Sequence, residues 1–172
     1  MSLLRFLGLG HAAPPEETET ESVRRIVDAL DRLDPDEAVR LARFAFVLGR
    51  VARADLAVTA DETRAMERLV RERGKLSEAQ AVVAVQIAKS QNVLFGGTDG
   101  YLVTREIACS ATREERLALL DCCFAVSAAD GEISPPEEAE LRKIATELGL
   151  PQSDLMAARS AHRAYLAVLK GT

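Results

Sequence analysis

Two pairs of acidic residues recur at the same spacing in the two halves of this chain of 172 residues. Glu62 follows Asp55 by seven positions, and Glu137 follows Asp130 by seven positions. Carboxylate oxygens are the ligands that hard cations such as Ca²⁺ and Mg²⁺ prefer. Soft metals are disfavoured because neither motif contains a thiol or an imidazole. The four residues Asp55, Glu62, Asp130 and Glu137 are therefore the candidate ligands of a divalent-cation site.

The residues around these pairs repeat as well, at a distance of 75 positions, so that 51–62 corresponds to 126–137. Further pairs at this distance are Val58 with Ile133, Met66 with Leu141, Leu69 with Ile144 and Gly74 with Gly149. Such a repeat indicates a supersecondary unit that was copied once, and each copy needs the other to bury its apolar face. We expect repeats over about 35–92 and 110–168, whose turns would pool the four carboxylates.

The elements that would position these residues are helices with clear start signals. Thr59, Ser77, Thr112 and Ser134 each stand three positions before a Glu or Gln, which is the pattern of a capping box. Apolar residues then recur at three- and four-residue steps, and no segment alternates for long enough to be a strand. The predicted helices span 22–33, 35–54, 60–73, 78–91, 99–109, 113–129, 135–148 and 152–168. We predict an all-α single bundle of about eight helices, built from two pseudo-symmetric repeats within a domain covering 22–172.

The same capping boxes offer a second interpretation of the acidic residues. Glu62 and Glu137 occupy the capping position, where a Glu side chain accepts a bond from a backbone N–H and needs no metal. Asp130-Gly131 is also a common turn dipeptide. Neither turn has enough oxygen ligands for a complete site of its own, and neither fits an EF-hand loop, whose early ligand positions would fall on apolar residues or Arg53. Both interpretations, metal ligands and helix caps, stay open.

Composition excludes several classes of function. The net charge of −5, without a basic stripe, argues against a nucleic-acid partner. The chain has no motif of a serine hydrolase, a zinc protease or a phosphate-binding loop, so we expect no enzymatic activity and no small-molecule substrate. A metal-dependent hydrolase is the minor alternative. His162 is expected to be packed or at the surface, and Cys109, Cys122 and Cys123 are expected to be reduced core residues.

The first 21 residues differ from the rest of the chain. A short apolar segment is followed by a stretch rich in Pro, Glu and Thr, which we interpret as a flexible linker. The apolar segment either packs on the protein's own core or docks on a partner or a bilayer surface. It lacks the order of a secretory signal, and no run approaches the length of a membrane span, so we expect a cytoplasmic protein.

The patterns Val51-x-x-Ala-Asp-x-x-Val-Thr-x-x-Glu62 and Val126-x-x-Ala-Asp-Gly-x-Ile-Ser-x-x-Glu137 resemble the two halves of the TerB-like, tellurite-resistance domain. The resemblance runs over about 38–163. It implies an all-helical fold that binds divalent cations through Asp55, Glu62, Asp130 and Glu137, with Glu138 as a lesser candidate. It also implies a role in bacterial tellurite or stress resistance, with protein partners at the inner face of the membrane. Leu56 departs from the pattern, since a glycine would be expected there.

Two functions remain in view. The first is a non-enzymatic module that binds Ca²⁺ or Mg²⁺. The alternative is a helical scaffold without metal, whose acidic residues only cap helices and whose apolar surfaces recruit protein partners or a second copy to form a homodimer.

Overall fold

The computed structural model describes residues 24, 26–51, 60–94, 100–129 and 131–170. The longer helices are α3 (Pro35–Val51), α4 (Ala60–Gly74), α5 (Glu78–Leu94), α6 (Gly100–Ser110), α7 (Arg113–Ser127), α8 (Pro135–Glu147) and α9 (Gln152–Ala161). A 3₁₀ turn, η2 (Arg163–Tyr165), and a short helix, α10 (Ala167–Lys170), follow. Residues 26–30 are also helical. The prediction of an all-α fold is confirmed over the described residues, in which the only β pairing is one isolated bridge.

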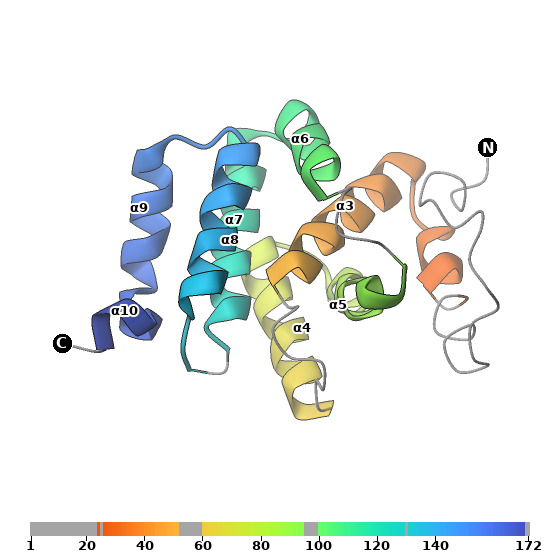
Figure 1. The fold of residues 1–172 in the computed structure, drawn as a ribbon. Coiled ribbons are helices and arrows are strands. Elements are labelled where there is room, and N and C mark those ends of the chain that lie inside the picture. The colour runs from red at the N-terminus through yellow and green to blue at the C-terminus, as the bar shows by residue number, and fades with distance from the viewer. Residues whose placement is uncertain (1–23, 25, 52–59, 95–99, 130, 171–172) are drawn as a thin grey trace.

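The α7 helix lies at the centre of the bundle. It packs against α3 and α4 on one side and against α8 and α9 on the other, and α8 runs antiparallel to it (Figure 1). From Leu119 to Ser127 every residue except Asp121 is buried, as expected of a helix enclosed by others. The α3 helix crosses this arrangement and contacts α5, α6, α7 and α8. None of the described helices is long and apolar enough to cross a membrane.

The helices begin where local chemistry predicts. Thr112 and Ser134 each form a complete capping box, with Glu115 at the start of α7 and Glu137 at the start of α8. Ser77 and Gln80 exchange the same pair of bonds at the start of α5. Each cap stabilises its helix by about 1 kcal/mol, because it satisfies backbone N–H groups that have no partner within the helix.

The prediction of one continuous helix over 152–168 is wrong. The α9 helix ends at Ala161, and the chain then turns so that the fully buried Leu166 reaches the core. Ile133 donates its N–H to the carbonyl of Tyr165 at 2.6 Å and accepts from the N–H of Ala167 at 3.0 Å. Burial of a large side chain and these two bonds outweigh the local preference for helix.

The starts of two helices recur at the distance seen in the sequence. The α4 helix begins at Ala60, and α8 begins 75 positions later, at Pro135. The packing of the two helices differs, because α4 lies mainly against α5 and α7, whereas α8 lies against α3, α6 and α7. The pseudo-symmetric relation of the two repeats stays a prediction.

Candidate functional site

The second acidic turn, which joins α7 to α8, is a tight backbone turn. Ala129 donates its N–H to the carbonyl of Val126 at 3.1 Å, and Gly131 donates to that of Ala128 at 3.0 Å. Gly131 has φ 95°, in the positive region that side chains rarely adopt, although a Cβ there would meet no atom within 4 Å. The glycine is therefore required by backbone conformation rather than by lack of space, as the sequence predicts.

The C-terminal segment holds the far side of this turn. Ile133 is fully buried, and the bridge to Tyr165 and Ala167 fixes its backbone on both sides. The turn is thus held between the end of α7 and the segment that follows α9.

Glu137 is engaged as a helix cap. The backbone N–H and the hydroxyl of Ser134 both donate to Oε2 of Glu137, at 2.8 and 2.7 Å, and the N–H of Glu137 donates to the Ser134 hydroxyl at 3.4 Å. This is the geometry that the cap interpretation predicts. It occupies one of the two carboxylate oxygens.

The other three candidate ligands are not described. Asp55, Asp130 and the side chain of Glu62 lie outside the described residues, although the backbone of Glu62 belongs to the first turn of α4. In Figure 1, α4 and α8 begin at the same lower end of the molecule, on either side of α7. Among the described side chains, no three His, Cys, Asp or Glu residues are placed to hold a metal ion. The joint site of four carboxylates stays a prediction.

One buried polar atom lies near the second turn. The hydroxyl of Ser127 has no hydrogen-bond partner in the described part of the chain, and the residue is 3% exposed. Ser127 stands three positions before Asp130. A buried oxygen without a partner is costly unless a further group satisfies it, and a hydroxyl oxygen is a donor type suited to a hard cation.

Glu138, the lesser candidate, has a structural role. Its buried carboxylate accepts from Arg142 at 2.6 Å and from Arg159 at 2.8 Å through the same oxygen. The hydrogen bond from Arg159, followed by that from Arg142, lowers the pKa of Glu138 against the effect of burial. Glu138 therefore joins α8 to α9, and its position argues against a role as a metal ligand.

Sequence reasoning missed a polar cluster around Arg50. The guanidinium, with a side chain only 11% exposed, donates to Glu140 at 2.8 Å, to Thr104 at 2.8 Å, and to Glu147. Burial by itself would lower the pKa of Arg50, but the bonds to Glu147 and Glu140 outweigh it and raise the pKa. The cluster joins α3 to α6 and α8 just before the first acidic turn. No local signal could reveal it, because the two carboxylates are 90 and 97 positions away.

His162 is a packed residue, as expected. Its ring stacks on Phe124 with centroids 5.5 Å apart, and Nε2 lies 2.9 Å from Asp121, which also accepts from Arg73 at 3.0 Å. The bond with His162 is the main cause of the lowered pKa of Asp121, and Arg73 adds to it.

The prediction for the cysteines is confirmed for two of the three. Cys122 and Cys123 are buried in α7, whereas Cys109 is exposed on α6. Burial raises the pKa of Cys122 to about 12 and also raises that of Cys123, so these thiols are unreactive at neutral pH.

Comparison with known proteins gives one match. The family model described as tellurite resistance protein TerB matches residues 42–160, while no curated protein and no solved structure matches the chain. The matched region contains both acidic turns and extends from α3 to α9. Because it spans well over half of the sequence, the chain belongs to the TerB family of helical domains associated with tellurite resistance.

Proposed function

We propose that this protein is a non-enzymatic module that binds a divalent cation, Ca²⁺ or Mg²⁺, through Asp55, Glu62, Asp130 and Glu137. It acts in the cytoplasm, in tellurite or stress resistance, with protein partners at the inner face of the membrane. Membership of the TerB family supports the link to tellurite resistance.

The observation that carries the proposal is the preorganisation of the second turn. Backbone bonds to Tyr165 and Ala167 fix Ile133, and Ser134 fixes the carboxylate of Glu137. Ligands that are already ordered lose less conformational entropy when an ion binds. Both capping bonds end on Oε2, and a carboxylate has about four acceptor sites on its two oxygens, so capping and metal binding are compatible.

Charge supplies the driving force. Carboxylates brought close together repel one another, and a bound cation replaces this repulsion with attraction. An ion that binds only the folded chain raises the free energy of unfolding by about 2.7 kcal/mol when its concentration is a hundred times Kd. Metal binding should therefore be visible as a rise in thermal stability.

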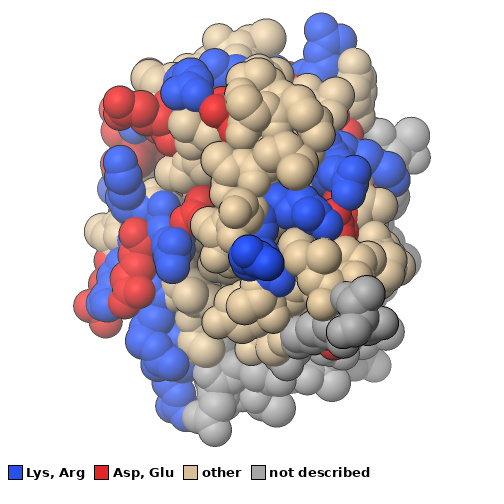
Figure 2. Space-filling model, turned by 90° about the vertical axis from the view of Figure 1, so that its left-hand side faces the viewer, with Lys and Arg blue, Asp and Glu red and all other residues tan. Residues whose placement is uncertain are grey.

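Two observations favour the alternative, a helical scaffold without metal. The capping box explains Glu137 completely, and the α9–α10 end of the molecule exposes large apolar side chains. Figure 2 shows this face with a mostly uncharged middle and with basic and acidic groups gathered mainly along its left side. The exposed apolar residues there are Met156, Tyr165, Val168 and Leu169. Such a face suits a protein partner or a second copy of the chain.

A metal titration with a matched pair of variants separates the two functions. Ca²⁺ and then Mg²⁺ are added to the metal-stripped full chain, and binding is followed by calorimetry and thermal unfolding. Glu137→Gln keeps an oxygen that can cap the helix but removes the charge of the ligand. Glu115→Gln is the control, because Glu115 forms the same capping box without an acidic turn before it.

The cation module predicts a higher Tm with ion in the wild type and in Glu115→Gln, and a loss of at least tenfold in affinity in Glu137→Gln. The scaffold predicts equal Tm with and without millimolar ion in all three proteins. Chromatography with light scattering then tests whether the α9–α10 face forms a homodimer, with Leu169→Glu as the disrupting variant.

A further inference from the structure

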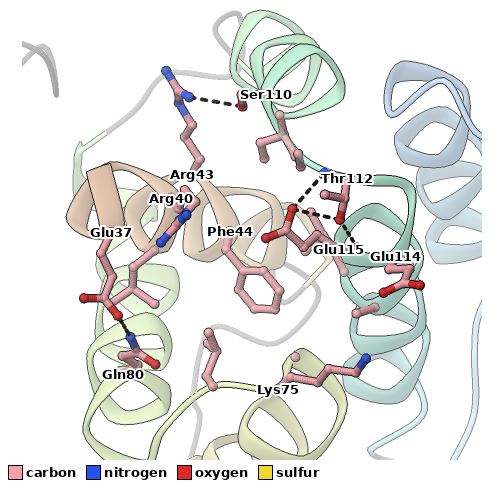
Figure 3. Close-up of a pocket in the computed structure, with 17 residues that line it drawn as sticks. Glu37, Arg40, Arg43, Phe44, Lys75, Gln80, Ser110, Thr112, Glu114 and Glu115 are labelled. Carbon is pink, nitrogen blue, oxygen red and sulfur yellow. Dashed lines mark hydrogen bonds between the residues drawn. The ribbon is translucent and has the colours of Figure 1, made fainter. Parts of the chain in front are cut away.

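A cavity of about 520 Å³ lies at the C-terminal end of α4 and the N-terminal end of α7. It opens between α3, the turn after α4, the turn before α7, and α7 itself (Figure 3). Its volume is within the range of small-molecule sites. The apolar part of its wall comes from Leu41, Phe44, Leu76, Ile107, Ala118 and Leu119. Sequence analysis did not predict this cavity, because its residues come from separated segments.

Gly74 makes room for the aromatic ring of the cavity. A Cβ on Gly74 would lie 2.7 Å from Cζ of Phe44, which is closer than real contacts allow. The sequence pairs Gly74 with Gly149, but only Gly149 of the two has positive φ, at 65°. Gly74 therefore leaves the space that the ring of Phe44 occupies. This ring projects into the cavity in Figure 3.

Lys75 is held in a conformation that lysine disfavours. Its φ is 55°, and it is the one residue other than glycine with positive φ in the described part of the chain. Lys75 directly follows the last residue of α4, where a left-handed residue commonly ends a helix, and this conformation fixes the start of its side chain beside the cavity. In Figure 3 the side chain of Lys75 runs along the lower edge of the cavity.

Three of the charged residues that line the cavity are engaged within the protein. Glu37 accepts from the side-chain amide of Gln80, and Glu115 accepts from the backbone N–H of Thr112 at 2.7 Å. Arg43 points away from the cavity and toward Ser110 in Figure 3. It also forms an ion pair with Glu106 at 2.8 Å.

Arg40 and Lys75 make no hydrogen bond or direct ion pair within the described residues. Arg40 lies between the carboxylates of Glu37 and Glu115 in Figure 3, and its charge adds to the bonds from Thr112 in lowering the pKa of Glu115, so this cation is already balanced. Lys75 lies on the other side of the Phe44 ring. An apolar wall with a lysine at its edge is complementary to an apolar molecule with an anionic head. Because Glu114 and two other carboxylates also line the cavity, a head with one negative charge fits better than a phosphate with two.

We propose that this cavity binds an organic monoanion, an aromatic or aliphatic carboxylate or sulfonate. The apolar body packs against Phe44 and Leu76, and the head lies at Lys75. This site is separate from the proposed cation site and does not depend on it.

The fluorescent probe 8-anilinonaphthalene-1-sulfonate has this chemistry, with an aromatic body and one sulfonate. We expect saturable binding of one probe per folded chain, with an affinity that excess Ca²⁺ leaves within about twofold. Lys75→Gln should weaken binding about tenfold, the loss of one charge-assisted hydrogen bond. Arg68→Gln is the control, because Arg68 is exposed on α4 and does not line the cavity. Octanoate should displace the probe, and inorganic phosphate should not.

Far-UV circular dichroism and thermal unfolding show that each variant is folded, since the probe also binds disordered states. Ala118→Leu fills the cavity without changing charge and should also weaken binding. The proposal is overturned if several probes bind per chain, if Lys75→Gln binds as the wild type does, if Arg68→Gln loses as much affinity as Lys75→Gln does, or if phosphate displaces the probe as well as octanoate.

Discussion

Asp121 illustrates how one carboxylate can serve several helices. It lies on α7, accepts from Arg73 at the end of α4, and is 2.9 Å from the ring nitrogen of His162 at the end of α9. Its side chain is 31% exposed, so water weakens these bonds without removing them. Asp121 therefore contributes to stability through its charge, and that contribution depends on pH.

Asp121→Asn should lower the free energy of unfolding by about 1–2 kcal/mol at pH 7, because both partners donate to a charged acceptor. The folded-state pKa of Asp121 is lowered, chiefly by the bond with His162, so its stabilisation is complete above the unfolded value of about 3.9 and is lost as the pH falls through the folded pKa. Urea unfolding between pH 7 and pH 2 should show the difference between variant and wild type shrinking in acid. A difference that is independent of pH contradicts this explanation, and Asp31→Asn at an exposed position is the control.

Among the elements, the segment after α9 depends most on tertiary contacts. Leu166 is fully buried within the bundle. Its neighbours Tyr165 and Ala167 form the bridge to Ile133. This contact also fixes the second acidic turn. A substitution in the segment after α9 should therefore alter the structure at the start of α8.

Leu166→Ala should lower the free energy of unfolding by about 2–5 kcal/mol, because it leaves a cavity where a large side chain is buried. Val168→Ala, two positions later and 50% exposed, should change it by no more than about 0.5 kcal/mol. Chemical denaturation measures both. Equal effects of the two substitutions would show that this segment does not pack as described.

The helix starts were predictable because their causes are local. Each capping box joins two residues three positions apart, so its pattern is visible in a short stretch of sequence. The two boxes are Thr112 with Glu115 and Ser134 with Glu137. The break after Ala161 was not predictable, because nothing in 152–168 forbids a helix. The break depends on Ile133, which belongs to a turn about thirty positions earlier.

At the scale of the whole molecule, the sequence predicts those parts of the candidate sites that have a pattern along the chain, and it does not predict those that depend on tertiary contacts. The acidic pairs are visible because they repeat along the chain. The cavity and the Arg50 cluster depend on which helices meet in the fold, and residues from α3, α6 and α8 meet at Arg50 without any pattern in the sequence. Glu137 caps α8 in both proposed functions, and ion binding is what distinguishes a ligand from a cap alone.

Arg50 is one of the residues that join the first and second halves of the chain by charge. The side chains of Glu140 and Glu147 on α8 are 26% and 13% exposed, so removal of the guanidinium leaves two largely enclosed carboxylates without this partner, and among the described residues Glu140 keeps only its contact with Lys143 at 3.5 Å. Arg50→Ala should therefore lower the free energy of unfolding by about 3 kcal/mol, at the lower end of the range for broken buried ion pairs.

The triple variant Arg50→Met, Glu140→Gln and Glu147→Gln removes the charges together and should recover at least half of this loss, because no unpaired charge remains. Urea unfolding at pH 7 measures both variants, and Arg71→Ala, whose contact with Glu72 is at the surface, should stay within about 0.5 kcal/mol of the wild type. If the triple variant is no more stable than Arg50→Ala, the unpaired charges on α8 are not the cause of the loss, and this explanation is wrong.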